Sequence, residues 1–251
     1  MPSHGFHDRA TGQSDKAARV REMFDAIAPR YDLFNDVLSA GVHRRWRTDA
    51  VDLLDPAPGS AYLDLCAGTL DLARLVAVRA PGARVVGADF SLPMLAEGRA
   101  KLAVHDASKV GEGPRGIQAV AADALRLPFP DGAFRGVIIG FGLRNLADYD
   151  AGLREMARML EPGGRLVVLE FTVPPGRVFR GLYHAYFHHV LPRVGAWISG
   201  QAPAARYLPD SVSRFPRAGE LAELVAAAGF ARVRYRYLTR GIAALHVGYK
   251  E

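Results

Sequence analysis

The stretch Leu63-Asp64-Leu65-Cys66-Ala67-Gly68-Thr69-Leu70-Asp71 decides the fold of this 251-residue chain. An apolar run leads into it from Ala61, and apolar residues at helical spacing follow as far as Val78. A strand, a tight turn with glycine and a helix, in that order, place the turn at the carboxyl edge of a parallel sheet, where open α/β folds bind ligands. Dinucleotide enzymes have three glycines in this turn. Only Gly68 is present here, so the turn alone does not identify the ligand.

The rest of the chain alternates short apolar strands with helical segments, which is the pattern of a parallel sheet covered on both faces. Near the end, Arg240-Gly241 separates two strand-like runs and predicts a closing antiparallel hairpin. We therefore expect a Rossmann-like α/β fold with a mostly parallel, seven-stranded sheet. The expected strands are 61–66, 84–89, 117–121, 136–141, 165–171, 233–238 and 242–249, and the expected helices between them are 70–78, 92–104, 150–160 and 216–228.

Composition narrows the function classes. The net charge is +6 and the isoelectric point about 9.7, which fits nucleic acid, an anionic membrane surface or an acidic ligand. No RNA-binding module is recognisable, so we expect no nucleic-acid partner. The sequence has no apolar run long enough to span a membrane, no signal core, no Cys/His metal cluster and a single cysteine, Cys66. These features predict a cytoplasmic protein without a metal.

The chain is expected to form one catalytic domain over residues 15–251, preceded by a disordered segment, 1–14. Residues 15–55 have helical patterning, with a helix opening at Ser14 or Asp15, and are expected to form a lid. Residues 172–215 form an insert in which arginines and aromatic residues occur and no acidic residue appears before Asp210. Two interpretations of this insert stay open: an ordinary solvated helix face, or a substrate lid that touches a membrane.

Two further strand ends outline a binding slot. Asp89 ends the second strand about twenty residues beyond Gly68, where a carboxylate can accept both ribose hydroxyls of an adenosine. Asp123 follows the third strand and can accept from an adenine amino group, while the amide of Ala124 meets a ring nitrogen. The alternative is that both aspartates merely cap turns or helices. Their occurrence at successive strand ends favours an adenosine ligand.

This combination resembles the class I S-adenosylmethionine methyltransferases, in which Leu160–Gly164 would be the turn before the fifth strand. More specifically, the chain resembles the ubiquinone/menaquinone C-methyltransferase family, over roughly residues 18 to 250. The segments that carry this resemblance are 23–25, 28–32, 35–36, Leu127-Pro128-Phe129-Pro130-Asp131, Phe141-Gly142-Leu143-Arg144-Asn145, Leu169-Glu170-Phe171, His189-Val190-Leu191-Pro192-Arg193, Tyr207-Leu208 and 244–250.

The resemblance implies S-adenosylmethionine as the cofactor. The family usually has glycine where this chain has Ala67 and Leu70, so a side chain at position 70 could narrow the methionine end of the slot. The positions expected to bind the cofactor are Asp64, Gly68, Thr69, Asp89, Asp123 and Ala124.

The reaction that the resemblance implies is C-methylation of a prenylated quinol ring in menaquinone or ubiquinone biosynthesis. Arg144 and Asn145 follow the fourth strand and are expected to hold the substrate oxygen, with Arg144 supplying positive potential rather than acting as a base. His189 is the candidate proton acceptor, although a histidine on a helix face is more often packed.

Several alternatives stay open. The acceptor could be another phenolic small molecule, or the chain could be a non-catalytic homologue that binds quinone or cofactor. Contact with an anionic membrane at its inner face, through the arginines of the insert, is expected for a substrate with a prenyl tail. A homodimer is left open.

Overall fold

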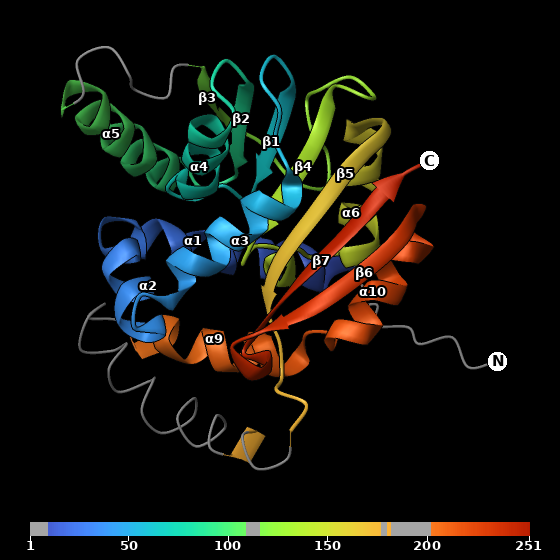
Figure 1. Ribbon diagram of the computed structural model, residues 1–251. Coiled ribbons are helices and arrows are strands. Elements are labelled where there is room, and N and C mark those ends of the chain that lie inside the picture. The colour runs from blue at the N-terminus through green and yellow to red at the C-terminus, as the bar shows by residue number, and fades with distance from the viewer. Residues whose placement is uncertain (1–9, 109–115, 177–179, 182–201) are drawn as a thin grey trace.

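The computed structural model describes residues 10–108, 116–176, 180–181 and 202–251. One seven-stranded sheet runs through the molecule, with strand order β3-β2-β1-β4-β5-β7-β6 (Figure 1). The first five strands pair in parallel, and β7 pairs antiparallel with both β5 and β6. This confirms the expected mostly parallel sheet with an antiparallel hairpin at its end. The strands are β1 (Ala61–Leu65), β2 (Arg84–Asp89), β3 (Ile117–Ala121), β4 (Phe134–Gly140), β5 (Leu160–Phe171), β6 (Phe230–Leu238) and β7 (Ala243–Lys250).

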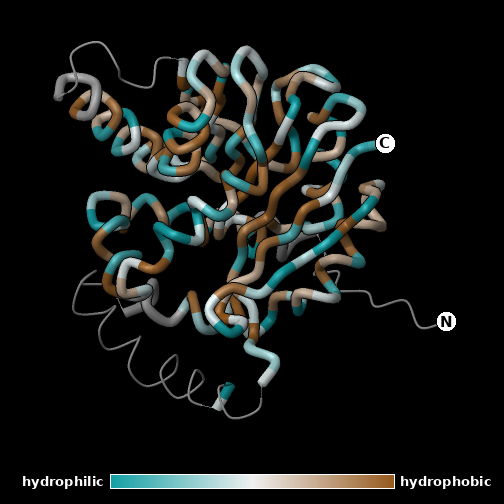
Figure 2. The backbone as a smooth tube through the Cα atoms, in the orientation of Figure 1, coloured by the Kyte–Doolittle hydropathy of each residue, from teal (hydrophilic) through white to brown (hydrophobic). Residues whose placement is uncertain are grey.

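The central strands are apolar throughout because helices cover both of their faces. In β4, the run Val137-Ile138-Ile139 is fully buried, and in β5 so is the run Leu166–Leu169. Figure 2 shows this apolar colour along the middle of the sheet. One face packs against α3 (Val42–Leu54), α4 (Asp71–Arg79) and α5 (Leu92–Ser108). The other face packs against α6 (Tyr149–Met159) and α10 (Ala218–Ala227).

The N-terminal helices lie across the carboxyl edge of the parallel strands (Figure 1). They are α1 (Ala10–Ile27), a short 3-10 helix η1 (Ala28–Arg30), and α2 (Tyr31–Ser39). Helix α9 (Ala202–Arg214) lies at the same edge, where it contacts the 3-10 helix η2 (Leu143–Asn145) and α1. The ligand-binding edge of the sheet is therefore covered by segments from both ends of the chain.

Most element boundaries differ from those expected by up to four residues, and three differences concern the organisation of the chain. Helix α1 begins at Ala10 rather than at Ser14 or Asp15. Strand β5 begins at Leu160, so Pro162-Gly163-Gly164 lies inside the strand as an irregularity instead of preceding it. The N-terminal helical pattern is interrupted at Ala40 and Gly41, which both have positive φ, of 48° and 74°. Alanine seldom adopts that conformation, so the break between α2 and α3 was not predicted at this position.

Candidate functional site

The turn after β1 forms an unusual loop at the carboxyl edge. Cys66, Gly68 and Leu70 all have left-handed φ values, of 54°, 51° and 62°. The Asp89 carboxylate joins this turn to the end of β2, because it accepts from the Gly68 N–H at 2.8 Å and from the Ser91 N–H at 2.9 Å. Burial raises the pKa of Asp89. A carboxylate has about four acceptor positions, so two bonds of this kind leave capacity for ribose hydroxyls.

The Leu70 side chain packs into the core of the protein. Its side chain is 1% exposed and belongs to the core on the α3–α4 face of the sheet. It fills space that two glycines leave open: a Cβ placed at Gly87 would lie 2.3 Å from Leu70 Cδ2, and one at Gly98 would lie 2.7 Å from Leu70 Cγ. The chain therefore accommodates a leucine at this turn by having no side chain at either neighbour, which favours lineage variation over a narrowed slot.

Asp64 contacts the helix that follows the turn. Its Oδ2 accepts from the Ala73 N–H in the first turn of α4 at 2.8 Å, and its side chain is 1% exposed. Burial raises its pKa to about 8. This geometry gives Asp64 a capping role beneath α4, while its expected contact with the cofactor stays a prediction.

Asp123 and Ala124 lie together just past β3. Asp123 is exposed, and its Oδ1 accepts from the Leu125 N–H at 2.9 Å, which is the turn-capping bond that the alternative interpretation predicted. Ala124 is buried against the α6 face of the core. A carboxylate has about four acceptor positions, so this bond leaves capacity for others. The bond within the turn and a bond to an adenine amino group are thus compatible.

Side chains of the N-terminal helices contact the carboxyl edge of the sheet. The Ser91 hydroxyl donates to Asp25 of α1 at 2.5 Å, and the Thr69 hydroxyl donates to Asp32 of α2 at 3.0 Å. Lys101 of α5 bridges Asp32 at 2.6 Å and Asp71 at 2.8 Å, and it also donates to the Thr69 hydroxyl at 2.9 Å. We name the group Asp32, Thr69, Asp71 and Lys101 the α2 latch. It holds the N-terminal segment over the turn.

Arg144 lies in a buried ion pair with Glu170 of β5. Their side chains are 7% and 1% exposed, and Arg144 Nη1 donates to Glu170 Oε1 at 2.7 Å and to the Phe141 carbonyl at 2.5 Å. Burial works to lower the pKa of Arg144, but Glu170, Tyr207 and Tyr31 together raise it above its ordinary value, so the guanidinium stays protonated. Glu170 places a negative charge beside the positive charge that the sequence led us to expect. Arg144 Nε is buried and has no hydrogen-bond partner among the described residues.

Asn145 is held at both ends of its amide. Its Oδ1 accepts from the Tyr207 hydroxyl of α9 at 2.9 Å, and its Nδ2 donates to the Phe141 carbonyl at 3.3 Å. Tyr207 is largely buried, and burial raises the pKa of its phenol. Helix α9 is therefore fastened to the strand end that carries Arg144 and Asn145, so the two candidate substrate-binding residues are preorganised by different parts of the chain.

Glycine is required inside the Phe-Gly-Leu-Arg-Asn segment because two strand ends approach closely there. A Cβ at Gly142 would lie 2.4 Å from Cys66 Cβ. Burial raises the pKa of the Cys66 thiol, which therefore stays neutral. The contact brings the turn that carries Arg144 next to the turn after β1, so ligands held at the two turns would be neighbours.

Two histidines bear on the search for a proton acceptor, the candidate His189 and His246 in the last strand. His189 lies outside the described residues, and its role stays a prediction. His246 of β7 is 2% exposed and bonds to the Ala218 carbonyl at 2.8 Å through Nε2. Burial lowers its pKa, so it is a packed neutral histidine.

Sequence reasoning missed three residues of this site: Glu170, Tyr207 and Lys101. The first two lie in segments that carry the family resemblance, and a glutamate inside an apolar buried strand is itself a signal that a cationic partner is present. Lys101 gave no signal, because one lysine on an amphipathic helix looks like any solvated residue.

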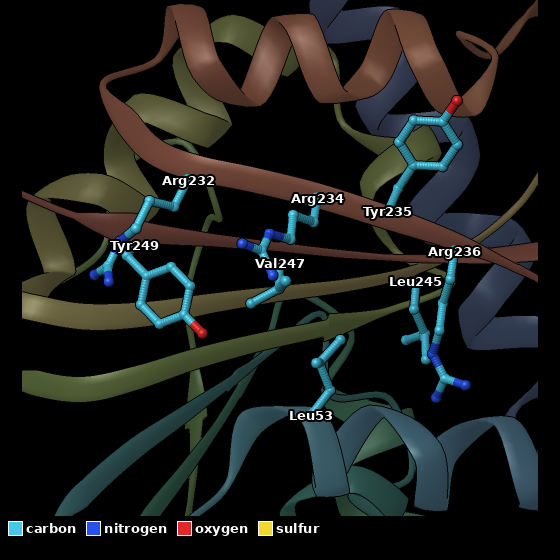
Figure 3. A pocket seen from close by; sticks show the side chains of 8 residues that line it. All are labelled: Leu53, Arg232, Arg234, Tyr235, Arg236, Leu245, Val247 and Tyr249. Atoms are coloured by element: carbon cyan, nitrogen blue, oxygen red, sulfur yellow. The ribbon is translucent and has the colours of Figure 1, made fainter.

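A groove of 440 Å³ lies elsewhere, on the uncovered face of β6 and β7. Figure 3 shows Arg232, Arg234 and Arg236 along β6 above it, with Leu53 of α3 on the opposite side. Arg232 lies over the Tyr249 ring at 4.4 Å. No residue of the carboxyl edge lines this groove, so it is separate from the candidate active site.

The fold is that of S-adenosylmethionine-dependent methyltransferases. A methyltransferase from Thermotoga maritima, described as a possible histamine N-methyltransferase, matches with a TM-score of 0.61 at 18% identity and covers 92% of this chain and 100% of its own. The [4+2]-cyclase SpnF matches with a TM-score of 0.67 at 17% identity, covering 92% of this chain and 94% of its own. One fold thus serves different reactions, and at such low identity the likeness concerns the fold alone.

Relatives found by sequence are far more similar to this chain and identify a family. "Demethylmenaquinone methyltransferase" of Thermus thermophilus is 54% identical over 227 residues, covering 90% of this chain and 99% of that protein. The protein of the same name from Deinococcus radiodurans is 48% identical and covers 95% of each chain. "Ubiquinone/menaquinone biosynthesis C-methyltransferase UbiE" of Paracoccus denitrificans is 40% identical and covers 98% of this chain and 96% of its own. The model of the ubiE/COQ5 methyltransferase family matches residues 12–250. The chain therefore belongs to the ubiE/COQ5 methyltransferase family and is an S-adenosylmethionine-dependent C-methyltransferase.

Proposed function

We propose that this protein methylates a ring carbon of a prenylated quinol, with demethylmenaquinol as the acceptor. Two relatives named for demethylmenaquinone are 54% and 48% identical, whereas two relatives named for both quinones are 44% and 40% identical. The observation that carries the proposal is the buried Arg144–Glu170 pair at the carboxyl edge, whose Arg144 Nε has no partner among the described residues. A buried donor without a partner is costly, so a substrate oxygen is its natural acceptor.

The residues of the edge fit the cofactor. Asp89 is fixed by two backbone amides and retains acceptor capacity for the ribose, and Asp123 and Ala124 stand where an adenine edge would lie. Gly68 and Thr69 belong to the turn that would face the methionine part. When bound, S-adenosylmethionine supplies an electrophilic methyl group on a sulfonium. Alignment in a site without water is the chain's main contribution.

Arg144 and Asn145 are proposed to bind the quinol oxygen. The ring carbon becomes nucleophilic when the adjacent hydroxyl loses its proton, and donors aimed at the developing phenolate stabilise it. Because Glu170 balances the charge of Arg144, we assign the guanidinium the role of a directed hydrogen-bond donor rather than of a free positive charge. Glu170 and Tyr207 act through these two residues and are positioning residues.

The proton acceptor is proposed to be His189. An imidazole titrates near neutrality, whereas Arg144 stays protonated and burial raises the pKa of Tyr207, so neither of these can accept a proton at pH 7. A His189→Gln variant is expected to lose turnover and the acidic limb of its pH profile. A pH profile with an unchanged acidic limb would exclude His189.

The protein is proposed to be cytoplasmic and to contact the membrane peripherally. The acid-free insert, with Arg177, Arg180 and Arg193, supports this, although of these arginines only Arg180 lies within the described residues. Within the described part of the chain, no helix has the length and apolarity of a membrane span. Neutralising the three arginines is expected to reduce flotation with anionic liposomes, and unchanged flotation would refute this contact.

The deciding experiment is methyl incorporation from labelled S-adenosylmethionine into two reduced acceptors in detergent, a demethylmenaquinol and a demethylated ubiquinol precursor. We expect incorporation into the naphthoquinol, and loss of at least about 100-fold in an Arg144→Met variant. An Arg135→Met variant, which removes an exposed arginine paired with Glu161, is the control. Methylation of neither quinol, with intact cofactor binding, would point to another phenolic acceptor.

A further inference from the structure

Thr172, the residue that follows β5, has a buried hydroxyl group without a partner. The residue is 4% exposed, and its Oγ1 makes no hydrogen bond with any described residue. Its backbone is held in place, because the Thr172 N–H donates to the Ile242 carbonyl at 3.0 Å and continues the pairing of β5 with β7 by one bond. A buried hydroxyl that makes no hydrogen bond is costly, which indicates a ligand as its partner.

The Thr172 side chain lies on the same side of the sheet as Glu170. Successive side chains of a strand point to opposite faces, so residues 166, 168, 170 and 172 share one face. Leu166 and Val168 are buried on the face that packs against α6 and α10. Glu170 comes next in this row and accepts from Arg144 Nη1 at 2.7 Å. Thr172 is therefore the neighbour, along the strand, of the ion pair that is proposed to bind the substrate.

Helix α9 covers this end of the sheet. Two of its apolar side chains pack against Phe171, the residue before Thr172, and its Tyr207 donates to Asn145 at 2.9 Å. Arg144 Nε, like Thr172 Oγ1, is buried and has no partner among the described residues. Two unsatisfied polar atoms therefore lie at the end of the sheet that α9 covers.

The spacing of these two groups favours a ligand with two oxygens. Residues 170 and 172 are roughly 7 Å apart along the strand, and Glu170 holds Arg144 at the first of these positions. A single oxygen bridges two polar groups only when they lie within about 6 Å of each other, since each hydrogen bond is about 2.9 Å long. A quinol ring carries its two hydroxyl oxygens on opposite sides, para to each other, and so offers one oxygen to each group.

We propose that the Thr172 hydroxyl binds the second oxygen of the quinol ring, para to the oxygen that Arg144 binds, and thereby determines acceptor specificity. The inference rests on the proposed function, because it assumes a quinol at this edge. Methyl transfer requires only the hydroxyl next to the reacting carbon to lose its proton, so the bond to Thr172 fixes the orientation of the ring and takes no part in the chemistry. A threonine hydroxyl both donates and accepts, so it distinguishes a hydroxyl from a hydrogen at this position of the ring.

The test compares two acceptors that differ only at this oxygen. One is a short-tailed demethylated naphthoquinol, kept reduced, and the other is the naphthol in which hydrogen replaces the second hydroxyl. Calorimetry on the complex with S-adenosylhomocysteine gives the Kd of each acceptor, and methyl transfer from S-adenosylmethionine gives kcat/KM. Thr172→Val removes the hydroxyl and keeps the shape of the side chain, whereas Thr172→Ser keeps the hydroxyl. Thr48→Val is the matched control, because the Thr48 hydroxyl bonds within α3, to the Arg44 carbonyl at 3.2 Å.

Thr172→Val is expected to bind the quinol about tenfold more weakly and the naphthol as wild type does, because a hydrogen bond is lost with only one of the two acceptors. The values of kcat/KM should follow the same pattern. Thr172→Ser and Thr48→Val should keep the wild-type preference for the quinol. In urea denaturation Thr172→Val should be at least as stable as wild type, since the hydroxyl bonds to nothing in the free protein.

Equal losses for both acceptors in Thr172→Val, or no loss for either, would overturn the inference. A marked loss of stability in this variant would overturn it too, because the hydroxyl would then have a partner within the protein. If wild-type protein binds S-adenosylhomocysteine but neither binds nor methylates either acceptor, the proposed function itself is wrong and the inference falls with it.

Discussion

Removing the charge of Glu170 should destabilise the protein strongly. Glu170→Gln keeps the shape of the side chain but leaves the Arg144 guanidinium, 7% exposed, without its counter-ion at 2.7 Å. Breaking a buried ion pair by removing one partner costs about 3–5 kcal/mol. Domains have a free energy of unfolding of about 5–15 kcal/mol, so this is a large part of the total. For a chain of this size it corresponds to a fall in Tm of roughly 6–20 °C.

Urea denaturation and thermal unfolding measure this cost directly. Glu161→Gln is the matched control, because Glu161 pairs with Arg135 at 3.7 Å with 44% and 58% exposed side chains, and such pairs contribute about 0–1 kcal/mol. In Arg144→Met/Glu170→Gln both charges are gone, so most of the lost stability should return. Turnover should not return, because the proposed donor to the quinol oxygen is absent.

Two results would refute this reasoning. If Glu170→Gln unfolds within about 1 kcal/mol of wild type, the pair is solvated rather than buried. If the double variant is no more stable than Glu170→Gln, the cost does not come from an uncompensated charge. Recovery of turnover together with stability in the double variant would remove Arg144 from the proposed mechanism.

Three further outcomes are expected. Burial raises the pKa of Asp64 from 3.8 to about 8. The stability that the protonated Asp64 side chain contributes is therefore fully present below its pKa in the unfolded chain and is lost as the pH rises through about 8. Asp64→Asn should therefore gain Tm over wild type increasingly from pH 5 to pH 8, and an equal gain at both pH values would contradict this. Gly87→Ala should lower the free energy of unfolding by about 1–3 kcal/mol in urea denaturation, since the new Cβ would lie 2.3 Å from Leu70 Cδ2. In a Leu70→Ala background the same substitution should cost almost nothing, and additive costs would mean that the two side chains do not touch. Lys101→Met should accelerate dissociation of S-adenosylhomocysteine in stopped-flow measurements by opening the α2 latch, whereas Arg79→Met, which breaks an exposed pair with Asp52, should not.

Sequence periodicity predicted the buried sheet well. The bounds of β2 and β3 agree with those expected, and the buried apolar runs of β4 and β5 identified those two strands, although they begin earlier than expected, at Phe134 and Leu160. It failed at Ala40, where an alanine takes the left-handed conformation of a helix C-cap and its N–H bonds to the carbonyls of Asp36 and Val37. It also could not place the Leu70 side chain, because the two glycines that receive it are distant in sequence and nothing local marks them as its neighbours.

The sequence predicted at which strand ends the candidate residues lie better than it predicted the charges around them. Strand ends with acidic residues placed Asp89 and Asp123 at one edge, since parallel strands finish together. The potential around Arg144 could not be predicted in the same way. Its partner, Glu170, comes from a strand 26 positions later, and only the register of β4 beside β5 brings the two together.

The position of β7 has a consequence for how the protein is made. This strand, Ala243–Lys250, separates β5 from β6 and pairs with both, although it is the last of the three to leave the ribosome. Until then β6 has no neighbour in the sheet and β5 has an open edge exposed to other chains. Such late, long-range pairing makes folding slow and the incomplete chain prone to aggregation. Truncation before Ala243 should therefore yield insoluble protein rather than a shortened domain.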